Sequence, residues 1–183
     1  MKRLIMLIFF SLITYSFSYQ IEENFTGQIV KKYENGQVQS IENFKNGKLD
    51  GEFKEFYKDG TLTQIGSFKN GDLESIKAFY ENGNLKFEEI LKDRKGKYRG
   101  YYPNEQLEEE GEVFQGEEVG LWKYYNEEGK LLSEGKYREG KKIGKWKLYN
   151  PDGSLLKIEN YKENREGLCI RLVTLEILKQ YLK

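Results

Sequence analysis

Side chains that could carry out acid–base, nucleophilic or metal chemistry are scarce in this sequence. It contains no His, the commonest general base and the commonest metal ligand in proteins. Cys169 is the single cysteine, so an internal disulfide and a cysteine-rich zinc site are excluded. The densest acids, Glu108–Glu110 and Glu117–Glu118, have the composition of a paired-carboxylate or Ca²⁺ site. We interpret both runs instead as solvated strand faces and turns.

Sequence motifs of catalysis are also missing. There is no G-x-S-x-G nucleophile elbow, no Walker-type phosphate loop and no H-E-x-x-H zinc motif. An enzyme built without these would need a concave cluster of carboxylates with perturbed pKa values. We therefore expect a protein that is not an enzyme, with no catalytic residue, no cofactor and no metal site.

Composition narrows the class of protein further. The 183 residues include 30 Lys and Arg against 30 Asp and Glu, whereas nucleic-acid-binding proteins usually show a basic excess. We therefore expect no nucleic-acid partner. Aromatic residues make up 15% of the chain, which is too many for a disordered protein. Together with 19 Gly, they suit many short strands joined by tight turns.

The first 18 residues have the three-part plan of a secretory signal peptide. A basic pair precedes the apolar run Leu4–Ile13, and Ser16 and Ser18 supply small residues at positions −3 and −1 of a cut after Ser18. This plan predicts export to the periplasm, the cell envelope or the medium. The alternative is an uncleaved membrane anchor, for which Leu4–Phe17 is short because a transmembrane helix needs about 20 residues.

A repeat of 22–24 residues organises most of the chain beyond this segment. Its copies start at Gly27, Gly51, Glu74, Gly96, Gly120 and Gly144. We number positions in a copy by their distance from this start. Position 2 is apolar or aromatic in every copy: Ile29, Phe53, Ile76, Tyr98, Trp122 and Trp146. Positions 5, 11 and 17 are mostly aromatic or aliphatic, and position 9 is Gly in all copies except the fourth, which has Glu105.

Each copy predicts a β-hairpin. The first turn carries Asn-Gly or Asp-Gly in four copies, a pair that favours a type I′ turn because both central residues need positive φ. A second turn, such as Asn46-Gly47 or Asn70-Gly71, comes about eleven residues later. Stretches of about seven residues between turns leave no room for helices. We predict an all-β fold: an elongated single-layer antiparallel β-meander of about six hairpin repeats, in which each copy contacts its neighbours.

The segments Gly120-Leu121-Trp122-Lys123-Tyr124-Tyr125 and Gly144-Lys145-Trp146-Lys147-Leu148-Tyr149 give the repeat its signature. This pattern resembles the bacterial variant of the MORN repeat over residues 27–167, with Gly27, Gly51, Gly96, Gly120, Gly144, Trp122 and Trp146 as the signature residues. The third and fourth copies depart from it, with Glu74, Arg94 and Pro103-Asn104-Glu105 in place of the usual glycines. The resemblance implies a scaffold that contacts proteins or lipids, and the family includes antitoxin-like components of toxin–antitoxin modules.

Two aromatic rows are expected to lie on opposite faces of the sheet, because side chains alternate along a strand. Positions 2 and 6 should share a face, and position 5 should face the other way. We interpret the rows chiefly as cross-strand ladders that hold a one-layer sheet together. The alternative is that the position-6 row is a platform for a partner: Tyr33, Tyr57, Tyr80 and Tyr102.

These assignments divide the chain into four segments. Residues 1–18 are the signal peptide, 19–26 a lead-in, 27–167 the six repeats, and 168–183 a half-repeat strand with a short C-terminal helix. Leu175, Leu178 and Leu182 recur at helical spacing and would cap the last strand edge, or else form a segment that awaits a partner or a membrane.

The function expected from the sequence is that of an exported, non-catalytic scaffold that acts by protein–protein contact. An antitoxin- or immunity-like role is implied by the resemblance, and contact at a cell surface fits export better. The alternative is a lipid- or envelope-binding module that uses exposed Tyr and Lys side chains. The partner and the oligomeric state do not follow from the sequence.

Overall fold

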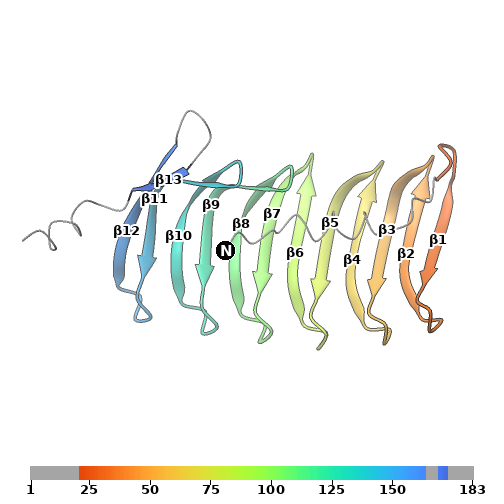
Figure 1. Ribbon diagram of the computed structural model, residues 1–183, viewed down its shortest axis with the longest axis horizontal. Helices are drawn as coiled ribbons and strands as arrows, with labels where there is room; N and C mark the ends of the chain where they lie inside the picture. The colour runs from red at the N-terminus through yellow and green to blue at the C-terminus, as the bar shows by residue number, and fades with distance from the viewer. Residues whose placement is uncertain (1–20, 164–168, 173–183) are drawn as a thin grey trace, which may run out of the picture.

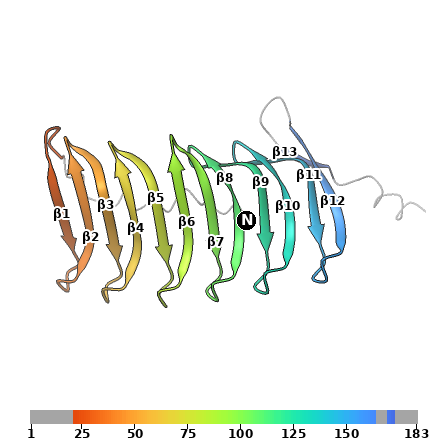
Figure 2. The same ribbon diagram turned by 180° about the vertical axis from the view of Figure 1, so that it is seen from behind.

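The computed structural model describes residues 21–163 and 169–172 and shows one antiparallel sheet whose thirteen strands follow chain order. The strands are β1 (Gly27–Lys32), β2 (Val38–Lys45), β3 (Lys48–Phe56), β4 (Leu62–Lys69), β5 (Asp72–Phe79), β6 (Leu85–Lys92), β7 (Lys95–Tyr101), β8 (Leu107–Phe114), β9 (Glu117–Tyr125), β10 (Leu131–Arg138), β11 (Lys141–Tyr149), β12 (Leu155–Glu163) and β13 (Cys169–Leu172). Figures 1 and 2 show them as a single elongated row from both sides. The predicted all-β meander is confirmed; the signal peptide and the C-terminal helix lie outside the described residues.

The core occupies one face of this sheet, which we call the inner face. Its buried apolar side chains are Phe44, Phe53, Ile76, Ala78, Tyr98, Val113, Trp122 and Trp146, from positions 2, 4 and 17 of the repeat. The strands curve along their length (Figure 1). Inner-face rings of successive copies are in contact, as Tyr98 is with Trp122 and Tyr124 with Trp146. The opposite, outer face carries positions 3, 5, 14 and 16. Positions 2 and 5 thus face opposite ways, as the alternation predicts.

The two tryptophans are the most completely buried large side chains. Trp122 has no exposed surface, and its ring lies 5.6 Å from that of Tyr98 and 6.0 Å from that of Tyr137. Its indole N–H donates to the Glu112 carbonyl at 3.0 Å, beside the bulge where the pairing of β8 with β9 shifts register. The Trp146 indole makes the same bond to Lys136 at 3.2 Å, beside the bulge between β10 and β11. Each bulge therefore bends the sheet over a tryptophan whose polar atom it also satisfies.

The turn geometry corrects one expectation. In the first turn, Gly36 has positive φ but Asn35 does not, so this turn is not type I′. The Gly36 N–H donates to the Tyr33 carbonyl at 2.9 Å, and the Asn35 side chain accepts from the Gln37 N–H at 3.1 Å. This is a type I turn followed by one left-handed residue, in which the Asn side chain caps the turn instead of adopting positive φ.

The second turns have the type I′ geometry that was expected of the first. Both central residues have positive φ in each of the five turns described between β2 and β11: Asn46-Gly47, Asn70-Gly71, Asp93-Arg94, Gln115-Gly116 and Glu139-Gly140. Among the signature glycines, Gly51, Gly120 and Gly144 have positive φ, while Gly96 instead allows close approach of the Ile90 carbonyl, which a Cβ would overlap.

The fourth copy holds Glu105 at φ 66°, where the other copies have glycine. Because a left-handed backbone costs a residue with a Cβ about 1 kcal/mol, we expect Glu105→Gly to raise the free energy of unfolding by about this amount. The matched control is Gly83→Ala at the same position of the third copy (φ 85°), where nothing lies within 4 Å of the new Cβ. Thermal unfolding should move up for the first variant and down for the second; equal shifts would contradict this account.

Candidate partner-binding surface

The tyrosines predicted as a partner-binding row make contacts within the fold. The hydroxyls of Tyr33, Tyr80 and Tyr102 each donate to a main-chain carbonyl of the next copy, at Phe56 (2.7 Å), Tyr101 (2.7 Å) and Tyr125 (2.8 Å). These bonds join successive hairpins at their first turns. The structure thus gives three of the four predicted residues a role in repeat stacking, and contact of this row with a partner stays a prediction.

On the outer face, the residue at position 5 depends on the residue at position 14 of the preceding copy. Where position 14 of the preceding copy is Glu, position 5 is Tyr and its hydroxyl donates to that carboxylate: Tyr101 to Glu88 (3.1 Å), Tyr125 to Glu110 (2.9 Å) and Tyr149 to Glu134 (2.9 Å). Where position 14 is Ile, position 5 is Phe, as in the pairs Ile41 with Phe56 and Ile65 with Phe79. A hydroxyl is thus present only where a carboxylate receives it.

Cations also contact the carboxylates of these Tyr–Glu pairs, and we call the pairs together with these cations the outer ladder. The Arg99 guanidinium lies 3.8 Å from Glu88 and 3.9 Å from Glu110, and the Lys147 amine lies 2.8 Å from Glu134. The hydrogen bonds from Lys147 and Tyr149 hold the pKa of Glu134 below its ordinary value. Glu88, Glu110 and Glu134 therefore each have a cation close by within the chain, and Glu110, part of one dense acidic run, belongs to this outer ladder.

Four exposed apolar side chains break the repeat pattern on this face: Val30 in β1, at position 3, which is Lys or Arg in the other copies, and three in the central strands. Ile90 occupies position 16, which is Asn43, Ser67, Glu112, Lys136 or Asn160 in the other copies. Phe114 occupies position 18, which is Lys or Arg in every other copy, and Leu121 occupies position 1, which is otherwise polar. They are 63%, 44% and 48% exposed. We call Ile90, Phe114 and Leu121 the central outer patch.

The three residues lie on β6, β8 and β9, in the middle of the sheet. Ile90 pairs with Lys97, and Lys97 in turn pairs with Glu112 of β8, the strand that carries Phe114. Because neighbouring strands lie about 4.8 Å apart, β6 and β8 are separated by about 10 Å, and β9 with Leu121 is one step further. The Lys95–Glu112 ion pair (3.5 Å) lies among them. Comparing each position across the copies would have found these residues from the sequence.

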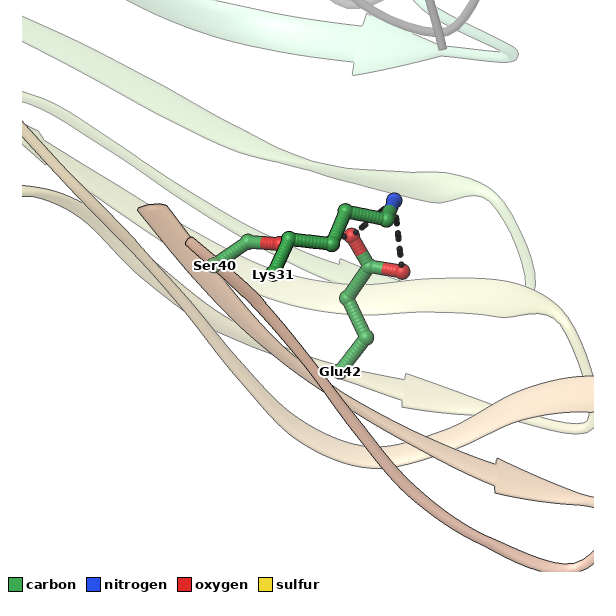
Figure 3. Close-up of polar contacts among 3 residues, drawn as sticks. All are labelled: Lys31, Ser40 and Glu42. Atoms are coloured by element: carbon green, nitrogen blue, oxygen red, sulfur yellow. Dashed lines mark hydrogen bonds and ion pairs between the residues drawn. The ribbon is translucent and has the colours of Figure 1, made fainter. Parts of the chain in front are cut away.

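The inner face also holds polar groups, and its N-terminal cluster is internally paired. The Lys31 amine lies 3.0 and 3.3 Å from the two oxygens of Glu42, and the buried Ser40 hydroxyl donates to Glu42 at 3.1 Å (Figure 3). Burial, and then the Glu42 charge, raises the pKa of nearby Glu55. This cluster is satisfied without a ligand.

A second inner-face cluster combines two acids with tyrosines. Glu109 is buried, and the hydroxyls of Tyr124 and Tyr137 lie 3.0 Å apart. Burial, followed by the charge of Glu109, raises the pKa of Glu118 to about 7, although Lys142 opposes the shift. Burial and the hydrogen bond with Tyr124 act in opposite directions on Tyr137, and the net effect raises its pKa to about 12. Of the two dense acidic runs, Glu109 and Glu118 therefore belong to this inner-face cluster, and Glu110 belongs to the outer ladder.

Glu118 predicts a pH dependence of stability. Its folded-state pKa, about 7, lies above the ordinary value of 4.5, so its contribution is complete below about pH 4.5 and is lost as pH rises through about 7. We expect Glu118→Gln to stabilise the protein relative to the parent by about 1–2 kcal/mol at pH 8, allowing for partial exposure, and to lose this advantage at pH 4.5. Urea unfolding at both pH values checks this, with exposed Glu117→Gln as control. A pH-independent difference would contradict it.

The two long sides of the sheet, where the turns lie, differ in charge. We call them its two edges. The second turns and their flanking residues carry eight exposed bases and four exposed acids; the bases are Lys45, Lys48, Lys69, Lys92, Arg94, Lys95, Arg138 and Lys141. The first turns and their flanking residues carry seven exposed acids and three exposed bases; the acids are Glu34, Asp59, Glu81, Glu105, Glu127, Glu128 and Asp152. An antiparallel meander places alternate turns on opposite edges (Figure 1), so a chain with balanced charge acquires a basic edge and an acidic edge.

The part of the chain that the structure describes holds no group of three or more His, Cys, Asp or Glu side chains that could bind a metal ion. No helix in the same residues is long and apolar enough to cross a membrane.

Fold and surface together define a hairpin-repeat scaffold, a class in which stacked short units present extended faces. The MORN repeat variant matches residues 25–46, 49–70, 76–93, 94–114, 118–139 and 142–163. The chain belongs to this family, which confirms the resemblance seen in its motifs, and MORN repeats are consistent with a scaffold that binds proteins or lipids.

Comparison with curated proteins finds no match. Among solved structures, a GtfA/B complex bound to UDP and GlcNAc aligns with 72% of this chain at 9% identity and a TM-score of 0.25. The alignment spans 23% of that protein's chain. A protein of unknown function from Bacteroides fragilis aligns over 81% of this chain and 90% of its own, at 12% identity and a TM-score of 0.15. Neither score is high enough to relate the functions.

Proposed function

We propose that the protein is an exported, non-catalytic MORN-repeat scaffold that binds a partner protein through the central outer patch. The observation that carries this is the exposure of Ile90, Phe114 and Leu121 at positions that are polar or charged in the other copies. Exposed apolar groups framed by charged ones are typical of protein interfaces. The core lies on the inner face, so the fold does not need these side chains outside.

Export rests on the signal-peptide plan of residues 1–18. Within an exported scaffold, contact at a cell surface is the role that we favour. An antitoxin- or immunity-like role fits the family resemblance but requires a partner that is itself exported. The charge-balanced outer ladder on either side of the patch would favour a partner whose contact is apolar at its centre and polar at its rim.

The test replaces each patch residue by one that other copies carry at the same position: Ile90→Asn, Phe114→Lys and Leu121→Lys in one variant of residues 19–183. Because these changes restore the repeat pattern, we expect thermal unfolding to be unchanged within experimental error. The immobilised protein is exposed to envelope extract and secreted proteins, and captured proteins are identified by mass spectrometry. The parent should retain a specific protein that the triple variant loses.

The matched control is Val30→Lys, which changes an exposed apolar residue of β1 outside the patch into the cation found at the same position of the next two copies. It should retain the partner. If the folded triple variant captures the same protein as well as the parent does, the central outer patch is not the binding surface.

A second candidate function, binding to anionic lipid, is favoured by the basic edge. Its eight exposed bases lie along one side of the sheet, and each Lys or Arg near an anionic surface contributes about 1 kcal/mol. Sedimentation with vesicles of phosphatidylglycerol and phosphatidylcholine tests it. Binding that falls with salt and with Lys45→Glu, Lys48→Glu and Lys69→Glu would support it, and equal binding to neutral vesicles would contradict it.

A further inference from the structure

The cations of the basic edge form facing pairs in alternate copies. In the second turns of the first, third and fifth copies, two cations lie directly opposite each other: Lys45 and Lys48, Lys92 and Lys95, Arg138 and Lys141. The second copy instead pairs Lys69 with Asp72 at this place, and the fourth copy pairs Phe114 with Glu117. Like charges that face each other across two strands destabilise a sheet. The fold by itself therefore gives no reason for the three pairs.

The acids of the chain do not neutralise these pairs completely. The Lys95 amine lies 3.5 Å from the Glu112 carboxylate. Lys48, Lys92 and Lys141 are exposed, and none of them makes an ion pair with an acid among the residues that the structure describes. Each facing pair therefore has a cation available to a carboxylate from outside the chain.

The acidic edge carries exposed carboxylates in the same three copies. Position 7, in the first turn, is Glu34, Glu81 and Glu127 in the first, third and fifth copies, and Lys or Pro in the others. These glutamates are exposed, and within the described part of the chain they form no ion pair. By contrast, the Asp59 and Asp152 side chains accept main-chain N–H groups of their own turns at 2.8 Å. The glutamates at position 7 have no comparable role in the fold.

The position-7 glutamates and the facing cations therefore share one spacing along the sheet. On both edges they recur in every second copy, which is every four strands, or about 19 Å. First and second turns lie on opposite edges and alternate along the chain (Figure 1). If two copies lie side by side in the same orientation, displaced by one strand, each first turn of one copy faces a second turn of the other. Charges of opposite sign then meet three times in register.

We propose that the basic edge binds the acidic edge of a second copy of this chain. Complementary charge fixes the register of such a contact. Each copy in the pair keeps one free edge, and the two free edges differ in sign, so the association continues into a ribbon of side-by-side sheets. The contact uses the turns and not the outer face, so it goes beyond the proposed function and does not depend on it.

Sedimentation velocity of the full chain at several protein concentrations measures the association. We expect the sedimentation coefficient to rise with protein concentration at low ionic strength. It should return to the monomer value in about 1 M salt, where the Debye length is only about 3 Å. A coefficient that stays at the monomer value at low ionic strength would overturn the proposal.

Charge reversal with mixing separates the contact from a general effect of net charge. One variant carries Glu34→Lys, Glu81→Lys and Glu127→Lys, and the other carries Lys48→Glu, Lys92→Glu and Lys141→Glu. Neither should associate alone, because both edges of each variant then have the same sign. An equal mixture of the two should associate as the parent does. The control Lys145→Glu, at an exposed base in the middle of β11, should leave the association unchanged. If the mixture does not associate, the edges do not bind each other.

Zero-length coupling of carboxylates to amines by a carbodiimide identifies the register. Strands such as β3, with nine residues, are about 30 Å long, so Glu34 and Lys48 of one copy cannot be coupled to each other. We expect peptides that join Glu34 to Lys48, Glu81 to Lys92 and Glu127 to Lys141, from linked copies only. Linked copies without any of these couplings would overturn the proposal. Binding of the parent to anionic vesicles without self-association would also overturn it, because the basic edge would then serve lipid.

Discussion

Replacing Trp122 by Ala should lower the free energy of unfolding by about 3–5 kcal/mol, the largest loss that we expect from a single substitution. The ring is fully buried between Tyr98, Tyr124 and Tyr137, and a one-layer sheet has no second layer that could collapse into the space it leaves. The Glu112 carbonyl would also lose the indole N–H that it accepts at 3.0 Å. Both losses fall on the bulge that bends β8 and β9.

Urea unfolding followed by tryptophan fluorescence of the remaining Trp146, together with circular dichroism, measures this effect. The control is Leu121→Ala, because Leu121 is the adjacent residue but points to the outer face and is about half exposed. We expect the control to change stability by less than about 0.5 kcal/mol. Similar losses for the two variants would show that the indole does not anchor the sheet.

The second large effect is expected at Gly111, which lies beneath the same ring. A Cβ built on Gly111 would approach the Trp122 indole to 2.2 Å, far inside contact distance. We expect Gly111→Ala to cost about 1–3 kcal/mol, because the ring must move against a packed strand. Gly135 has the same relation to Trp146, with a Cβ distance of 2.2 Å, so Gly135→Ala should behave alike.

A double-mutant cycle separates this clash from any general cost of alanine at the site. In the Trp122→Ala background the three atoms nearest to the new Cβ, all of the indole, are gone, so Gly111→Ala should then cost less than about 0.5 kcal/mol. Additive losses in the double variant would mean that the glycine is needed for its backbone and not for the space above it. Chemical unfolding of the four proteins of the cycle decides between the two.

The pairing of glycine with tryptophan shows how the inner face is assembled. Position 15 is Gly in the copies that precede Trp122 and Trp146 and in the second copy, which precedes Ile76; it is Glu in the first and third copies, which precede Phe53 and Tyr98. Each tryptophan therefore lies against a glycine, although glycine at this position is not confined to the copies that face a tryptophan. The pattern is present in the sequence at position 15, but it acquires a meaning only once the register sets position 15 beside position 2 of the next copy.

The tyrosine row predicted for a partner has a role inside the fold, and its contact with a partner stays a prediction. The aromatic periodicity of the sequence indicated Tyr33, Tyr57, Tyr80 and Tyr102 as a possible platform for a partner. In the structure, three of their hydroxyls donate hydrogen bonds that join successive copies. Regular positions in a repeat serve what every copy needs, which is stacking on its neighbours. The central outer patch lies instead where single copies depart from the pattern, so a search for regular positions does not find it.

The sequence by itself determined the hairpin period, the number of copies, the all-β meander and the family, because turn residues and strand alternation act over a few neighbouring residues. The tertiary structure decided the turn types, the Gly111–Trp122 contact, the exposure of the central outer patch and the division of balanced charges between two edges. Each of these depends on which residues of different strands lie opposite one another, and the register that sets this comes from bulges and packing across the whole sheet.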